Sequence, residues 1–174
     1  GTTVVTNCAV RGVETTGGRV SGVVTEKGLI SCTAVVIAAG AWSSLLCRGL
    51  RLNFPQLKVV ASVFRTEAFE GGPDTAAWGG AFAVRKRLDG GYTVANGQWN
   101  DVDVVPDSFR HAKAFYPALR NEWRGLKFRL GQNFLEEARR PTHWRPDEVS
   151  PFERVRVLDP RPTSDAVQSA KLAL

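Results

Sequence analysis

The stretch AVVIAAGAWSSLLCRGL, residues 34–50, decides the fold class. Its first part, Ala34 to Ala39, is apolar without interruption over the length of a strand, which is typical of a parallel strand buried on both faces. Gly40 ends this run abruptly, and the residues after it favour a short helix that stops near Gly49. We therefore expect a buried strand, a tight turn and a helix, as in an α/β domain.

The turn between this strand and this helix consists of small residues, Ala38 to Ala41. Such a turn places backbone N–H groups and the positive end of a helix at the edge of the sheet, where a phosphate or a ring can approach closely. The same turn can equally serve only to pack a helix onto a sheet, so both interpretations stay open at this point. The patterns G-x-G-x-x-G and G-x-x-x-x-G-K do not occur in the sequence.

The residues before this unit predict three short strands in succession. Thr3 to Val13 is rich in residues that favour strands, and Arg19 to Thr25 alternates with several valines. Gly17-Gly18 separates the two, and Lys27-Gly28 leads into a third strand, Leu29 to Cys32. This spacing indicates an antiparallel β-meander.

The chain changes character at Pro55. A long strand is predicted at residues 57–66, followed by a glycine-rich loop. Phe82 to Val84 and Tyr92 to Val94 then flank Leu88-Asp89-Gly90-Gly91, which is a good hairpin signal. We expect this second region to be an antiparallel sheet.

Helices are predicted in the last third of the chain. One runs from Asp107 to Phe115, capped by Asp107 and ended by Pro117. His111 is expected on the solvent side of this helix. A second begins at Trp123, because apolar residues recur from there at helical spacing while Arg129, Gln132, Asn133 and Arg140 fall on the other face. The apolar residues, which we expect to be core, are Trp123, Leu126, Leu130, Phe134 and Ala138.

Two further elements are predicted towards the end. Residues Phe152 to Leu158 favour a strand, and the segment SDAVQSAKLAL, residues 164–174, favours a helix. The thiol of Cys47, next to Leu45 and Leu46, is expected to be buried as a small apolar group.

The combination and order of these segments resembles a known family. The segment VVIAAGAWSSLL, residues 35–46, follows CAVRGVETTGGRVSGVVTEKGLISCTA, residues 8–34, and precedes the hairpin FAVRKRLDGGYTVANG, residues 82–97. This is similar to the flavin-dependent amine oxidoreductases of the D-amino-acid oxidase and glycine oxidase family. The resemblance implies an α/β fold, α+β overall: the C-terminal part of a Rossmann-like FAD-binding domain at 1–52, and an incomplete antiparallel-sheet substrate domain with helices at 53–174.

The resemblance also implies site residues. The main chain of Val10 would hold the adenine of FAD, and Ala39, Gly40 and Trp42 would line the turn beside this cofactor. Phe82 falls where related enzymes place an aromatic residue over the substrate pocket. Because Phe82 has no hydroxyl group, it cannot hydrogen-bond a substrate carboxylate. No catalytic residue is assigned by the resemblance.

The implied reaction is oxidation of an amine or amino acid by transfer of hydride from the α-carbon to the flavin N5, which gives an imine that hydrolyses. The family's G-x-G-x-x-G segment and its carboxylate-binding arginine have no counterpart here. The sequence also contains no Met. We therefore expect an internal fragment that is inactive alone.

Composition excludes several other classes. The chain has 174 residues, 43% hydrophobic and 23% charged, as in ordinary globular proteins, and no apolar run is long enough for a transmembrane helix. Three widely spaced cysteines predict reduced thiols and a cytoplasmic location. Two distant histidines make a metal site unexpected.

The net charge supports an alternative function. The formal charge is +6, and between Arg120 and Arg145 seven basic residues stand against three acidic ones, seven minus three being +4. A basic β-rich module without flavin that binds nucleic acid or an acidic partner is therefore the alternative. Helical spacing already explains these arginines as a solvated face, so no nucleic-acid partner is expected.

Overall fold

The computed structural model describes residues 1–80, 82–96, 98–156 and 162–172. By its internal contacts the chain forms two compact units. The first contains residues 1–56 and the described residues from Glu136 to Arg156, and the second contains residues 57–135 and the described residues from 162 onward. The division into an FAD-binding domain at 1–52 and a substrate domain at 53–174 assigns the residues differently and stays a prediction.

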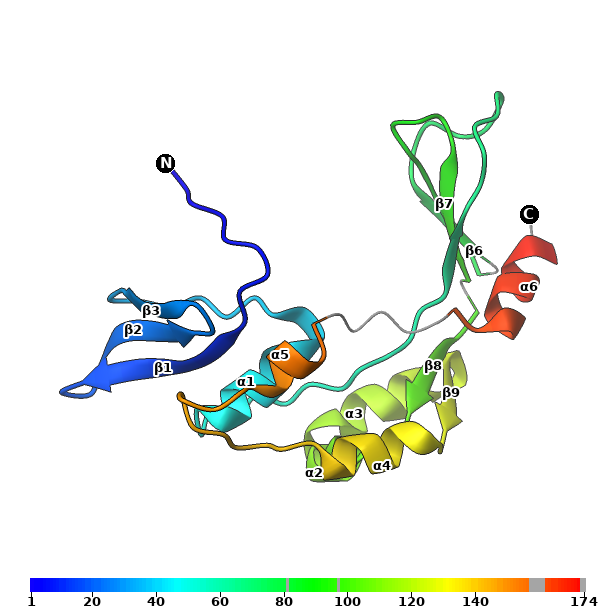
Figure 1. Ribbon diagram of the computed structural model, residues 1–174. Coiled ribbons are helices and arrows are strands. Elements are labelled where there is room, and N and C mark those ends of the chain that lie inside the picture. The colour runs from blue at the N-terminus through cyan, green and yellow to red at the C-terminus, as the bar shows by residue number, and fades with distance from the viewer. Residues whose placement is uncertain (81, 97, 157–161, 173–174) are drawn as a thin grey trace. The chain divides into compact units, whose positions relative to one another are not determined.

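An antiparallel meander forms the sheet of the first unit (Figure 1). Gly17 and Gly18 make the first turn with φ of 59° and 77°, as their sequence predicts. The first strand starts at Val10 instead of Thr3, because Val10 pairs with Thr25 and the second strand ends there. The strands are β1 (Val10–Thr16), β2 (Arg19–Thr25) and β3 (Gly28–Ser31).

The apolar run from Ala34 to Ala39 forms no strand, so the buried parallel strand predicted there is wrong. A parallel strand needs neighbours that satisfy its backbone groups. In the described part of the chain β1, β2 and β3 pair only with one another. Val36 is consequently 90% exposed.

The helix predicted after this run is confirmed. It consists of a 3-10 turn, η1 (Gly40–Trp42), and α1 (Ser43–Gly49), in which Cys47 is buried as expected. A second helix, α5 (Pro151–Arg154), occupies the start of the strand predicted at 152–158, of which residues 157 and 158 lie outside the described residues. The sequence Ser150-Pro151-Phe152-Glu153 is a capping signal, because Glu153 Oε1 accepts the Ser150 N–H at 2.8 Å.

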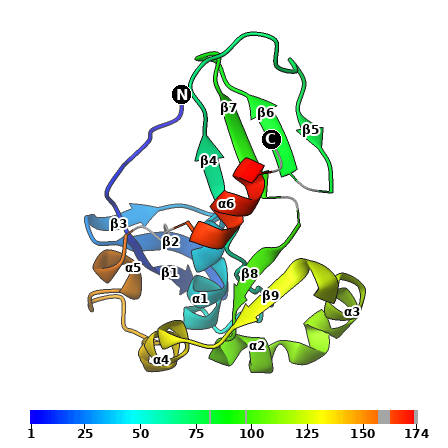
Figure 2. The ribbon, with the colours of Figure 1, turned by 90° about the vertical axis from the view of Figure 1, so that its right-hand side faces the viewer.

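A four-stranded antiparallel sheet forms most of the second unit, in the order β4-β7-β6-β5 (Figure 2). The hairpin predicted between Phe82 and Val94 is confirmed, although Gly97 at its end lies outside the described residues. The strand predicted at 57–66 forms only at Val63–Arg65. Val60, earlier in the same segment, makes an isolated bridge with Asp101. The strands are β4 (Val63–Arg65), β5 (Ala77–Trp78), β6 (Phe82–Lys86) and β7 (Tyr92–Asn96).

The amphipathic helix predicted from Trp123 is wrong over its first half. Residues Leu126–Arg129 form a strand, β9, which pairs in parallel with β8 (Asn100–Asp103). Pairing with a neighbouring strand outweighs the local helical pattern. Trp123 lies in η2 (Trp123–Gly125) and is 58% exposed, so it is not a core residue. The helix α4 begins only at Gln132 and ends at Arg139.

Two helices connect β8 to β9, as a parallel pair requires: α2 (Pro106–Arg110) and α3 (Ala112–Glu122). The predicted stop at Pro117 is wrong. This proline removes one N–H bond to the Lys113 carbonyl, and both residues lie on the exposed side, where water can bind that carbonyl. Asp107 is not the cap of α2. The N-cap residue is Val105, and the Val105 N–H donates to Ser108 Oγ at 3.1 Å. His111, expected in solvent, is 8% exposed at the junction of the two helices.

The predicted C-terminal helix is confirmed as α6 (Ser164–Leu172), which packs beside β7 (Figure 2). The fold class, α and β elements with a meander and an antiparallel sheet, is confirmed. No helix among the described residues is both long and apolar enough to cross a membrane. The buried apolar residues of the second unit are Tyr92, Val94, Val102, Val105, Ala166 and Ala170.

Candidate functional site

A pocket of about 320 Å³ lies in the first unit, between the start of the meander, the turn before α1 and the segment that follows α5. Its walls are apolar and aromatic, apart from one guanidinium and one amide. The residues that line it are Asn7, Cys8, Ala9, Val10, Ala39, Trp42, Leu46, Phe152 and Arg156.

Three of the residues to which the family resemblance gives a role at the cofactor meet at this pocket. Val10, Ala39 and Trp42 line it, although Val10 is 29 positions from Ala39 in the chain. Gly40 joins Ala39 to Trp42 in η1 but is not one of the lining residues. Phe82 belongs to the second unit, where it starts β6, is half-buried and pairs with Asn96.

Gly40 gives the turn its shape. Its φ is +52°, a conformation that side chains disfavour, and an added Cβ would meet no atom within 4 Å. Gln56 holds the turn from outside: its Nε2 donates to the Gly40 carbonyl at 3.0 Å, and its Oε1 accepts the Ser44 N–H at 3.2 Å. The backbone here is therefore fixed, with open space beside it.

Glu26 fixes the opposite wall. Its Oε1 accepts the backbone N–H of Ala9 at 2.9 Å, and its own N–H donates to the Ala9 carbonyl at 3.0 Å. The same carboxylate accepts two bonds from Arg156, at 2.8 and 2.7 Å. These bonds lower the pKa of Glu26 to about 2, the Arg156 bond being the largest cause and the Ala9 bond the second. The ion pair thus ties Arg156 to the strand that begins at Val10.

An aromatic cluster closes the pocket on a third side. The rings of Trp42 and Phe152 meet edge to face with centroids 5.3 Å apart, and Trp144 packs on Phe152 in the same way at 5.4 Å. The Trp144 Nε1 donates to the Arg11 carbonyl at 2.6 Å. The guanidinium of Arg140 lies 5.2 Å from the centre of the Trp42 ring. Trp42 is therefore held at a fixed angle in the wall.

A second ion pair anchors α5, which carries Phe152. Arg11 donates to both carboxylate oxygens of Glu153, each at 2.9 Å. The Arg11 bond is the main reason why the pKa of Glu153 is lowered to about 2, ahead of the bonds from Ser150. Phe152 and Arg156 thus both lie next to residues that are bound to the meander.

Sequence reasoning missed Phe152, Arg156 and Glu26. Glu26 and Arg156 are 130 positions apart, and no local pattern predicts that they pair. The capping signal at Ser150 would have placed Phe152 on a helix, but not at this pocket.

The arrangement suits binding more than proton transfer. Its small residues and flat aromatic walls fit a ring, and its one cation is already paired with Glu26. Among the described residues, no group of three or more His, Cys, Asp or Glu side chains gathers as metal ligands would. Cys8 is the lining residue with a nucleophilic side chain, and we assign it no catalytic role.

Comparison with known proteins gives a consistent result. Residues 1–162 match the family described as FAD dependent oxidoreductase. Over 46 residues the chain is 48% identical to a D-amino acid dehydrogenase of Sinorhizobium medicae (strain WSM419), which is 26% of this chain and 11% of that protein.

Two solved structures are similar over nearly the whole chain. The L-amino acid deaminase from Proteus vulgaris is 32% identical with a TM-score of 0.84, over 96% of this chain and 39% of that one. The L-amino acid deaminase from Proteus myxofaciens, solved in complex with anthranilate, is 34% identical with a TM-score of 0.87, over 95% of this chain and 37% of that one. The chain thus spans less than two fifths of the length of either structure.

Proposed function

The chain belongs to the FAD dependent oxidoreductase family, and on this basis we propose that it is part of an enzyme that oxidises amino acids and that its first unit holds one end of the FAD. The observation that carries the proposal is that Val10, Ala39 and Trp42 line a single pocket. The family resemblance implies a role in FAD binding for each of these residues.

The pocket fits a ring system of FAD in size and in lining. Its volume of about 320 Å³ is near the lower end of ligand pockets, which span roughly 300–1,000 Å³, so it would take one ring system of the dinucleotide. Ala39 leaves room for close approach to the backbone, and Trp42 and Phe152 supply flat walls. We assign the adenine to this pocket, beside the main chain of Val10.

FAD, when bound, accepts a hydride from the α-carbon of the substrate at its N5. The residues of this chain that we assign to FAD position it and exclude water from it. The chain supplies less than two fifths of the fold of its structural relatives, so we propose that these 174 residues alone are inactive and retain FAD weakly or not at all.

The names of the relatives support a proposal for the substrate class. The two solved structures described above are L-amino acid deaminases that match over nearly the whole chain, whereas the D-amino acid dehydrogenase matches over only 46 residues. We therefore propose an α-amino acid substrate, with the L form preferred. Anaerobic addition of L- and D-amino acids to the full-length flavoprotein tests this directly, since bleaching of the flavin absorbance reports the reductive step alone. Faster bleaching by D forms would refute the preference.

The alternative of a basic binding module receives no support from the described contacts of the basic stretch. Three of its arginines pair with acids: Arg129 with Asp101, Arg140 with Glu137 and Arg145 with Asp147. Internal pairing of this kind reduces the charge that is presented to an anionic partner.

The substitution Ala39→Leu tests the pocket. A leucine side chain would occupy space in the pocket that we assign to the adenine, and we expect the affinity of the full-length protein for FAD to fall at least about tenfold. Ala34→Leu is the matched control, because Ala34 is exposed and does not line the pocket. FAD retained per chain after gel filtration is the measurement. Equal retention in both variants would refute the assignment.

A further inference from the structure

A second hollow lies in the other compact unit, where β8 and β9 pair beside the start of α6. Its volume is about 440 Å³. Charged residues of both signs line it together with two aromatic rings. The lining residues are Trp99, Asp101, Lys127, Phe128, Arg129, Thr163 and Asp165.

One cation of this hollow has no ion-pair partner among the described residues. The ammonium of Lys127 lies 3.3 Å from the centre of the Trp99 ring, in a cation–π contact. Arg129, in contrast, is 3.5 Å from the Asp101 carboxylate and 3.4 Å from the Thr163 hydroxyl. Lys127 is therefore the cation that can receive an anionic group.

One carboxylate of the hollow also has no ion-pair partner among the described residues. Asp101 is 4% exposed, accepts the Thr163 hydroxyl at 2.6 Å and pairs with Arg129, so its charge is compensated internally. Asp165, in the first turn of α6, is exposed and accepts only the Ser164 hydroxyl, at 3.2 Å, in the part of the chain that the structure describes. Asp165 is the group that can receive a cation.

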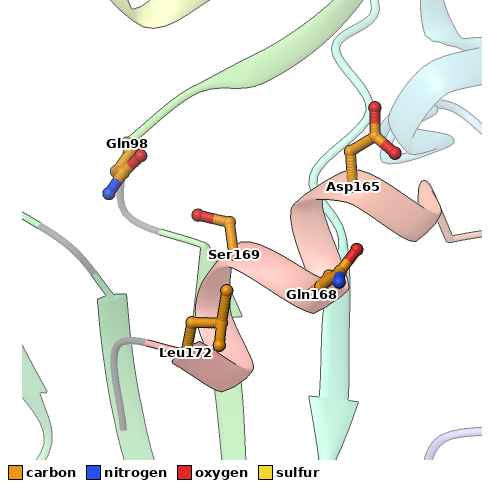
Figure 3. A pocket seen from close by; sticks show the side chains of 5 residues that line it. All are labelled: Gln98, Asp165, Gln168, Ser169 and Leu172. Atoms are coloured by element: carbon orange, nitrogen blue, oxygen red, sulfur yellow. The ribbon is translucent and has the colours of Figure 1, made fainter.

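A further hollow of about 420 Å³ continues from Asp165 along α6 and also has Gln98, Gln168, Ser169 and Leu172 in its lining (Figure 3). Ser169 follows Asp165 by one helical turn, so both lie on the same face of α6. Figure 3 shows the Ser169 hydroxyl on the side of α6 that faces Gln98. The two hollows share Asp165, and four of the five described residues that line the second are polar.

We propose that this pair of hollows binds a free α-amino acid as its zwitterion, with the carboxylate at Lys127 and the ammonium at Asp165. The side chain of the ligand would lie towards Gln98 and Ser169, whose amide and hydroxyl favour a polar side chain such as that of glutamine. A simple anion would meet the carboxylate of Asp165, and a simple cation would meet Lys127. Only a ligand with both charges satisfies both groups.

The site differs from the cofactor pocket, which lies in the first unit, and the proposal assigns no reaction to it. It therefore does not depend on the proposed function. A protein that binds no flavin at all could still bind an amino acid here, and an active flavoenzyme could fail to do so.

The experiment follows the indole N–H resonance of Trp99 in full-length protein labelled with ¹⁵N at tryptophan. The resonance is assigned as the one missing in Trp99→Phe. L-glutamine is added under anaerobic conditions, so that turnover does not consume it, and acetate and methylamine, each with one of the two charges, are added to parallel samples. We expect a saturable shift with L-glutamine and an affinity at least about tenfold weaker for either single-charge probe.

Two variants and one control test the geometry. Lys127→Met and Asp165→Asn are each expected to weaken the glutamine-induced shift about tenfold. Lys113→Met removes the same charge from an exposed site on α3 and is expected to leave the affinity unchanged. A Trp99 resonance that does not move with glutamine, acetate that binds as well as glutamine, or unchanged binding in Lys127→Met would each overturn the proposal.

Discussion

Replacing Gly72 by alanine is the sharpest test of the packing of the second unit. Tyr92 of β7 is 1% exposed, and its ring lies against Phe69 with centroids 4.8 Å apart. A Cβ at position 72 would lie 2.6 Å from Tyr92 Cζ and 2.9 Å from Tyr92 Cε2, and closer still to the hydroxyl oxygen. Real Cβ atoms do not approach other heavy atoms so closely, so either the loop or the ring must move.

The expected cost follows from the buried position. A ring that is almost fully enclosed cannot rotate away into solvent, and adding one methyl group to a packed core costs about 1–3 kcal/mol. We therefore expect Gly72→Ala to lower the free energy of unfolding by about 1–3 kcal/mol. Gly80→Ala is the control, because a Cβ at Gly80 would meet nothing within 4 Å.

Urea unfolding followed by far-ultraviolet circular dichroism measures both variants. The double variant Gly72→Ala with Tyr92→Phe adds a stronger test. The Tyr92 hydroxyl is buried without a hydrogen-bond partner among the described residues, so its removal relieves the shortest of the three contacts without the loss of a bond. The cost of Gly72→Ala should therefore be smaller in the Tyr92→Phe background. Equal stability of the Gly72→Ala and Gly80→Ala proteins would refute the reasoning.

Two more outcomes are expected from the first unit. In Glu26→Gln, stability should depend less on pH between about 4.5 and 2: the folded pKa of about 2 lies below the ordinary 4.5, so the Arg156 pair stabilises the protein above pH 4.5 and is lost as the pH falls. The measurement is acid unfolding of Glu26→Gln and of the parent protein, with Glu14→Gln, at an exposed site, as the control. Identical acid transitions in Glu26→Gln and the parent protein would contradict the prediction. Trp144→Phe should lower the free energy of unfolding by about 1–3 kcal/mol, because it removes the donor at 2.6 Å from the Arg11 carbonyl. Urea unfolding measures this loss, and Trp78→Phe, which alters an 85% exposed ring, is the control. An equal loss of stability in both variants would contradict the role of that bond.

Local signals predicted the elements that need only near neighbours. Gly17-Gly18 and Leu88 to Gly91 specify tight turns, and the strands beside them pair across those turns, so the meander and the hairpin were found. Residues 126–129 were predicted as helix because their apolar spacing is helical. They form a strand because β8 lies beside them, and that neighbour follows from the tertiary fold alone.

The same distinction applies to the candidate site. Ala39, Gly40 and Trp42 are contiguous, so a sequence pattern can identify them, and Val10 followed from the order of segments in the family. Phe152 and Arg156 reach the pocket from more than 100 positions away. The partners that hold them there are Arg11, in strand β1, and Glu26, in the turn after β2. Charged residues at such positions are usually expected to be solvated.

The pocket therefore depends on two long-range ion pairs as much as on the residues that the family pattern identifies. Arg11–Glu153 and Glu26–Arg156 each join the meander to the segment around α5, and each holds the pKa of its carboxyl at about 2. Each pair is lost only when its own carboxyl is protonated, so the pocket should keep its three walls down to pH values well below the ordinary pKa of 4.5. Loss of flavin from the full-length protein on mild acidification, above that pH, would then have to come from parts of the cofactor site other than this pocket.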